Sequence, residues 1–299
     1  MLRQLRKSLV WYIFLAPTFI VYVVFIAYPT LQTFRLSVFQ EVATKQQFVG
    51  ALQYWRLLTN DIFYTTLINT IGLGIAFLVL VVPLSLILAT LLNQLRVLPN
   101  LFKTIYFLPQ VTSTVAIALI FSYVFNPSWG LVNGTLHAIG ITATPLWLAE
   151  PRVSLTGSRA LATLMAVWGA LGYEMLIFLA GLQAVPIELH DAALVDGASP
   201  LQEWWHVTIP SLRPTIIFIL LTGTIDAMSR FSDLWILGGP NGSPARSLQT
   251  IVMYMYQTAF EGSDFNLASA IAVVMFVIVL VLTLVNFRLF LRRDFSNAD

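Results

Sequence analysis

Long stretches without ionisable side chains are the feature that most constrains this chain. Residues 265–287 contain no charged side chain at all. A helix needs about 20 residues, at 1.5 Å per residue, to cross roughly 30 Å of hydrocarbon. Of the 299 residues, 58% are hydrophobic and only 10% are charged, which is too few charges to coat a soluble globule of this size. We therefore expect a membrane protein.

Six such stretches are long enough to span a bilayer, and they predict an all-α membrane protein with six transmembrane helices. The predicted helices are residues 9–28, 67–92, 104–125, 160–185, 215–235 and 265–287. The first is too long for the core of a signal peptide and lacks a small-residue cleavage site, so we interpret it as a retained helix. No soluble domain or internal repeat is visible, and residues 1–299 are predicted to form a single transmembrane domain.

The basic residues indicate how the chain is oriented. Cytoplasmic flanks of membrane helices carry an excess of Lys and Arg. With six crossings, the following basic residues fall on one side: Arg3, Arg6, Lys7, Arg96, Lys103, Arg213, Arg288, Arg292 and Arg293. Both termini are therefore predicted to be cytoplasmic. The connection between the fourth and fifth helices has one Arg against four acidic residues, so its cytoplasmic position follows only from the number of crossings.

The sequence lacks the residues that several other classes of protein require. A net charge of +2 gives no electrostatic footprint for nucleic acid, and the absence of cysteine excludes thiolate chemistry. We find no metalloprotease or nucleophile-elbow motif, and the three histidines are too dispersed for a metal site. None of the three lysines follows a glycine, as a phosphate-binding loop requires. We expect no enzyme and no bound cofactor; if ATP drives this protein, ATP and Mg²⁺ bind to another chain.

The connection at residues 186–210 is polar and carries signals for two short helices. Pro186 suits a first helical turn, and Gly197 stands where a left-handed C-terminal cap belongs. Ser199 and Gln202 have the spacing of a capping box at the start of the second helix. We predict that the second helix stops before Pro210, which gives a compact helical hairpin on the cytoplasmic face.

This connection resembles the signature loop of the permease subunits of ABC importers, which reads Glu-Ala-Ala, three residues, Gly, nine residues, Ile-x-Leu-Pro. The matching or conservatively replaced positions, together with one nearby carboxylate, are Asp191, Ala192, Ala193, Asp196, Gly197, Val207, Ile209 and Pro210. The resemblance implies the type I importer (MetI-like) permease fold. It also implies that residues 186–210 form a coupling loop that docks on a separate ATPase and transmits its nucleotide-driven closure.

Weaker matches along the chain are similar to the sugar-uptake branch of that family, in particular the larger permease subunit of maltose and glycerol-3-phosphate importers. They are Phe48-Val49-Gly50, Asn69-Thr70, Phe107-Leu108-Pro109, Phe125-Asn126-Pro127, Gly238-Gly239-Pro240 and the segment from Tyr254 to Phe260. This likeness implies alternating-access import of a di- or oligosaccharide or a glycosylated polyol. The implied partners are a second permease, two ATP-binding subunits and an extracytoplasmic solute-binding protein, at the bacterial cytoplasmic (inner) membrane.

Charged residues at bilayer depth are candidates for function because their burial in lipid is costly. Asp226, Arg230 and Asp233 fall in the fifth predicted helix, and spacings of four and three place them on one side of it. They either face a translocation pathway and bind hydroxyls of a solute, or form an internal ladder of ion pairs. Both interpretations stay open.

The fourth predicted helix adds Trp168, Tyr173 and Glu174 as candidate contacts of the solute. Aromatic rings can stack on sugar faces, although in this chain most aromatic residues must face lipid. The alternative function is an ion-driven secondary transporter that uses Glu174 and Asp226 as proton sites. A membrane scaffold that moves no solute is a third possibility.

Overall fold

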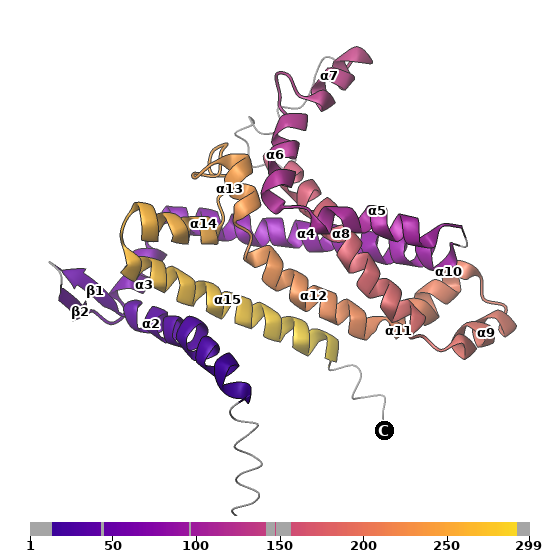
Figure 1. Cartoon of the computed structure of the whole chain (residues 1–299), viewed down its shortest axis with the longest axis horizontal. Helices are drawn as coiled ribbons and strands as arrows, with labels where there is room; N and C mark the ends of the chain where they lie inside the picture. Colours follow the sequence, from indigo (N-terminus) through magenta and orange to yellow (C-terminus); the bar gives the residue numbers. More distant parts are fainter. Residues whose placement is uncertain (1–13, 43–44, 96, 142–146, 148–156, 292–299) are drawn as a thin grey trace, which may run out of the picture. The chain divides into compact units, whose positions relative to one another are not determined.

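The computed structural model describes residues 14–42, 45–95, 97–141, 147 and 157–291, and the side chains of this part up to residue 288. The chain divides into two compact units. Unit 1 comprises residues 1–63 and 255–277, and unit 2 comprises residues 64–254 and 278–299. Apart from one β-hairpin, the regular structure described is helical (Figure 1).

Unit 1 combines a membrane-length helix with a small hairpin. Its elements are a helix from Phe14 to Leu36 that includes η1 (Val23–Ala27) and α2 (Tyr28–Leu36), then β1 (Phe39–Val42), β2 (Lys45–Phe48), α3 (Leu52–Leu58), η3 (Gln257–Glu261) and the first part of α15 (Phe265–Leu291). The two strands are antiparallel, and Phe39 pairs with Phe48.

Unit 2 holds most of the helices. They are α4 (Asp61–Gln94), α5 (Pro99–Val111), α6 (Thr114–Val124), α7 (Leu131–Ala138), α8 (Ser158–Gln183), α9 (Ile187–Val195), α10 (Pro200–Glu203), η2 (Trp204–Thr208), α11 (Ile209–Ser211), α12 (Arg213–Met228), α13 (Ser232–Gly238), α14 (Ile251–Tyr256) and the end of α15. Helix α8 packs against α5, α6 and α12, so it is central to this unit.

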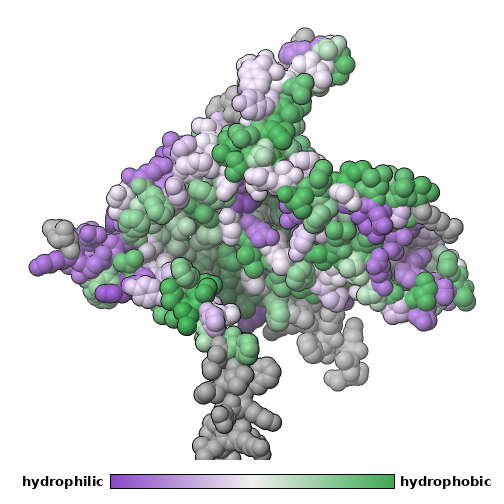
Figure 2. Space-filling view, in the orientation of Figure 1, coloured by the Kyte–Doolittle hydropathy of each residue, from purple (hydrophilic) through white to green (hydrophobic). Residues whose placement is uncertain are grey.

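Four described helices are long and apolar enough to cross a membrane, and the number rises to six if each of two bent helix pairs forms one span. The four are Phe14–Leu36, Asp61–Gln94, Ser158–Gln183 and Phe265–Arg288. The bent pairs are Pro99–Val111 with Thr114–Val124 and Pro200–Ser211 with Arg213–Met228. Hydrophobic side chains cover much of the surface over α5 and α6 (Figure 2), as expected for helices in contact with lipid.

The third predicted helix, residues 104–125, is not one straight helix. Helices α5 and α6 meet at an angle of 95°. Thr112, between them, has an extended backbone with φ −83° and ψ 143°. Pro109 lacks an amide hydrogen, which weakens the last turn of α5, and the polar run at residues 112–114 follows directly. These residues allow the chain to leave the helix.

The fifth predicted helix, residues 215–235, is also interrupted. Helix α12 ends at Met228, α13 begins at Ser232, and Arg230 lies in the break between them. The expectation that Arg230 occupies the face of a continuous helix was therefore wrong. The remaining predicted helices differ mainly at their ends, and α4 begins six residues before the predicted start at residue 67.

Two prolines that were expected to end helices do not do so. The first helix continues past Pro29 to Leu36, and the second helix of the 186–210 connection continues past Pro210 to Ser211. A π turn precedes each proline, at Val23–Ala27 and at Trp204–Thr208. Because a π turn pairs residues five apart, it shifts the hydrogen-bond pattern where proline offers no donor. Residues 9–13 of the first predicted helix lie outside the described residues.

Candidate functional site

The connection at residues 186–210 forms a helical hairpin, as predicted. Helix α9 ends in a Schellman motif, in which Gly197 N–H bonds the Leu194 carbonyl at 3.1 Å and Ala198 N–H bonds the Ala193 carbonyl at 3.0 Å. Gly197 has φ +74°, a conformation that side chains with a Cβ rarely adopt. This glycine therefore sets the turn between the two arms of the hairpin.

Two side-chain contacts hold the second arm. The Gln202 Oε1 atom accepts hydrogen bonds from the backbone N–H and the hydroxyl of Ser199, both at 2.8 Å, as one half of a capping box does. His190 Nδ1 on α9 lies 2.5 Å from Glu203 Oε1 on α10. This pair joins the two arms across the hairpin.

Most of the signature residues gather around one groove of the hairpin. The groove has a volume of about 530 Å³, and its lining includes Ala192, Ala193, Asp196, Gly197 and Val207. Five of the eight residues of the predicted coupling site are thus brought together there. Asp191 is exposed on α9, whereas Ile209 and Pro210 are half-buried at the base of the second arm.

The base of the hairpin is joined to the membrane helices. Trp204 and Ile209 pack against a buried apolar cluster that contains Phe178 of α8 and Ile219 of α12. The Trp204 indole N–H also donates a hydrogen bond of 3.1 Å to the hydroxyl of Thr90 on α4. The base of the hairpin is therefore in direct contact with three long helices of unit 2.

A second candidate site is a cavity of about 300 Å³ within unit 2. Five of the six residues predicted for a solute pathway line it: Tyr173, Glu174, Asp226, Arg230 and Asp233. The lining also includes Gln110, Thr112 and Thr114. Sequence reasoning missed these three because it took residues 104–125 as an unbroken helix; the polar run after Pro109 was the available signal.

Arg230 and Asp233 form an ion pair at the wall of this cavity. Arg230 Nε donates to Asp233 Oδ2 at 2.9 Å, and Arg230 Nη2 donates both to that oxygen and, at 3.0 Å, to the carbonyl of Ala162. Within the described part of the chain, no ion pair includes Asp226. Of the series of ion pairs considered from the sequence, the structure thus contains one, between Arg230 and Asp233. Asp226 lines the same cavity but takes no part in that pair.

Two polar atoms in the cavity lining have no hydrogen-bond partner among the described residues. They are Glu174 Oε2 and Arg230 Nη1, and Glu174 is only 3% exposed. A buried polar group without a partner is costly, so such groups mark places where water or a ligand binds. The cavity can therefore both accept and donate hydrogen bonds.

Trp168 does not line this cavity. It lies beside a separate hollow of about 340 Å³ whose walls come mainly from α5 and α8. Its ring packs on Phe121 with centroids 5.7 Å apart. Trp168 and Glu174 are six residues apart on α8, so their side chains point to different sides of this helix. Among the described residues, no group of three or more His, Asp or Glu side chains could hold a metal ion.

The hairpin, the membrane-length helices and the polar cavity together define a transport subunit of the inner membrane. The sequence model of one family, described as "Binding-protein-dependent transport system inner membrane component", matches residues 81–294. The chain belongs to this family and has the MetI-like permease fold. It is a multi-pass ABC transporter permease, and such permeases are not enzymes.

Curated relatives match nearly the whole chain. The arabinooligosaccharide transport permease AraP of Bacillus subtilis is 32% identical over 93% of this chain and 87% of the relative. The lactose transport permease LacF of Rhizobium radiobacter is 32% identical over 92% of both chains. The trehalose/maltose transport permease MalF of Thermococcus litoralis is 31% identical over 97% of this chain and 96% of its own.

A solved structure supports the fold independently. One chain of a bacterial alginate ABC transporter, crystallised in complex with an alginate-bound periplasmic protein, superposes with a TM-score of 0.85 at 23% identity. The match covers 98% of this chain and 97% of that chain. Membership of this family does not favour the alternative of an ion-driven secondary transporter.

Proposed function

We propose that this chain is the carbohydrate-translocating permease subunit of an ATP-driven importer, coupled to a separate ATPase through residues 186–210. The proposed solute is a di- or oligosaccharide or a glycosylated polyol. The partners are a second permease, two ATP-binding subunits and an extracytoplasmic solute-binding protein. ATP and Mg²⁺ bind to the ATPase subunits, and both termini of this chain lie in the cytoplasm.

The observation that carries the proposal is the exposed tip of the coupling hairpin. Val195, Leu194 and Leu201 are 87%, 65% and 66% exposed, close to the Gly197 turn. Large apolar side chains grouped at a protruding turn favour docking on another protein. Trp204 connects the hairpin to α4, so a partner that binds the tip can move the membrane helices.

A matched pair of variants at Gly197 tests the coupling. A Cβ added there meets nothing within 4 Å, so a substitution acts through backbone strain at φ +74° and not through a clash. Gly197→Val should abolish solute-stimulated ATP hydrolysis and uptake in proteoliposomes, because β-branched residues avoid this conformation. Gly197→Asn should retain most of both activities, since asparagine tolerates left-handed backbone. Equal solute-stimulated hydrolysis in both variants would contradict the coupling role.

The cavity supports the proposed class of solute. Its lining presents three carboxyl groups, from Glu174, Asp226 and Asp233, and one guanidinium, from Arg230, which is already paired with Asp233. Carboxyl oxygens accept hydrogen bonds from hydroxyl groups, whereas ionised carboxylates repel an anionic solute. This arrangement favours a neutral polyhydroxylated solute. Uptake that prefers an acidic oligosaccharide to a neutral one of equal length would argue against this class.

A further inference from the structure

Helix α3 in unit 1 exposes several large apolar side chains. Gln53 and Leu57 on one side are fully buried. On the other side, Leu52, Trp55 and Leu58 are 42%, 68% and 50% exposed. These three residues follow one another at intervals of three, so they share a single face of the helix. We call this face, Leu52, Trp55 and Leu58, the α3 apolar face.

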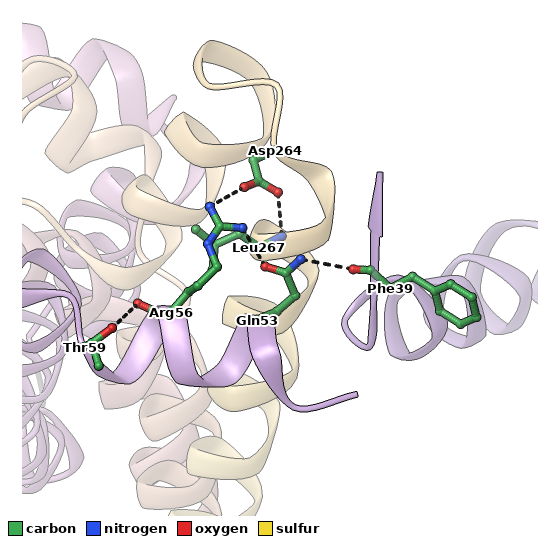
Figure 3. A network of polar contacts seen from close by, with 6 residues as sticks. All are labelled: Phe39, Gln53, Arg56, Thr59, Asp264 and Leu267. Atoms are coloured by element: carbon green, nitrogen blue, oxygen red, sulfur yellow. Dashed lines mark hydrogen bonds and ion pairs between the residues drawn. The ribbon is translucent and has the colours of Figure 1, made fainter. Parts of the chain in front are cut away.

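Two polar side chains, buried Gln53 and partly exposed Arg56, hold α3 in place (Figure 3). Gln53 Nε2 donates to the carbonyl of Phe39 at 3.1 Å, and Arg56 Nη1 donates to Gln53 Oε1 at 2.8 Å. Arg56 Nη2 also forms an ion pair of 3.0 Å with Asp264 Oδ2. These contacts join α3 to the β-hairpin through Phe39 and to Asp264, just before α15.

These contacts also fix the level of α3 relative to two membrane helices. Asp264 Oδ1 accepts a hydrogen bond of 2.9 Å from the N–H of Leu267, in the first turn of α15. Asn266, in the same turn, donates to the carbonyl of Leu36, where the first membrane-length helix ends, at 3.1 Å. Helix α3 therefore lies level with the end of one membrane helix and the beginning of another. Membrane helices begin and end at the membrane–water interface.

We propose that the α3 apolar face lies in the interfacial layer of the extracytoplasmic leaflet of the membrane, in direct contact with lipid. Three exposed apolar side chains on a surface helix are unfavourable in water but favourable at the boundary of the acyl chains. Tryptophan is enriched at this depth because its ring is apolar and its N–H remains able to bond polar groups. The leaflet follows from the proposed function, in which the N-terminus is cytoplasmic, because α3 comes after the first membrane-length helix has crossed the membrane.

Helix α3 needs its polar contacts with the rest of unit 1 in addition to the contact with lipid. Helix α3 has seven residues, which is too few for stable binding to a membrane by itself. It is held in place by Gln53 and Arg56. The β1–β2 hairpin beside it exposes hydrophilic side chains along much of its length (Figure 2), although Phe48 at its base is 71% exposed.

Because the chain has no cysteine, single labels can be introduced without background from it. A nitroxide is attached to Trp55→Cys, and in a second variant to Leu52→Cys, in the assembled transporter reconstituted into phosphatidylglycerol–phosphatidylethanolamine vesicles with cysteine-free partner subunits. Lys45→Cys, at the exposed tip of the β-hairpin, is the matched control. The accessibility of each label to oxygen, which partitions into lipid, and to a water-soluble nickel chelate is measured by power-saturation EPR.

Labels at positions 55 and 52 should have a ratio of oxygen to nickel accessibility several-fold above that of the label at position 45. Free access of nickel at position 55, equal to that at position 45, would overturn the proposal by showing that the face is in water. Low access of both reagents at position 55 would overturn it by showing that protein covers the face. In that case the measurement is repeated without the solute-binding protein. Access that rises identifies the covering protein as the binding protein, and unchanged access identifies it as another membrane subunit.

Discussion

Gly172 of α8 lies directly against the backbone of Tyr106 in α5. A Cβ placed on Gly172 would be only 2.0 Å from the Tyr106 carbonyl oxygen, and 2.8 Å from the Cα of Phe107. Contacts with backbone atoms cannot be relieved by a change of rotamer. This contact therefore requires glycine, and it holds α5 at the position from which the chain bends into α6.

We first predict that Gly172→Ala destabilises the assembled transporter, by about 1–3 kcal/mol or more, because α5 must move to admit the methyl group. Gly169→Ala on the same helix is the control, since a Cβ there meets nothing within 4 Å. Thermal stability in detergent, followed by size-exclusion chromatography, measures the difference. Equal melting temperatures of the two variants would contradict the close approach of α5 and α8.

A second prediction separates the two carboxylates that were expected to act together. Asp233 is paired with Arg230, so Asp233→Asn leaves a buried guanidinium without its partner, at a cost of about 3–5 kcal/mol, and assembly should suffer. Asp226 lines the cavity without an ion pair to a described residue, so Asp226→Asn should lower uptake while assembly stays normal. Uptake in proteoliposomes and subunit yield distinguish the two effects. Normal uptake by Asp226→Asn would exclude it from the pathway.

A third prediction concerns the link between the coupling hairpin and α4. Trp204→Phe removes the hydrogen bond to Thr90 but keeps the aromatic packing, with a loss of about 1 kcal/mol. We expect basal ATP hydrolysis to be retained and the stimulation by solute and binding protein to fall. Trp205→Phe is the control, because Trp205 is 56% exposed beside it. If both variants show the same stimulation, the Trp204–Thr90 contact does not transmit the movement.

A fourth prediction tests the pair that closes the hairpin. His190 and Glu203 side chains are each about one quarter exposed, at 25% and 23%, so their hydrogen bond is partly protected from water. A double-mutant cycle with His190→Ala and Glu203→Ala should give a coupling energy of about 0.5–1.5 kcal/mol in stability. Additive effects would show that the two arms are held by the Gly197 turn and by apolar packing alone.

Much of this protein is determined by local sequence. Uncharged runs of about 20 residues specify membrane helices wherever they occur, because a backbone in lipid must satisfy its hydrogen bonds internally. The hairpin at residues 186–210 is equally local: Gly197 and Ser199 terminate and start helices through bonds to neighbours within five residues. For the same reason, the family resemblance could be found from residues at fixed spacings in that loop.

Only the tertiary structure decided where the long helices break and which side chains meet. Helix α5 packs against Gly172, about sixty residues away in sequence, before the bend of 95° into α6, and Gln110 and Thr112 at this bend line the cavity. The π turns before Pro29 and Pro210 were invisible to rules that treat proline as the end of a helix. Likewise, the pairing of Arg230 with Asp233 and not with Asp226 follows from a break in the helix, because helical periodicity places side chains correctly only while the helix continues.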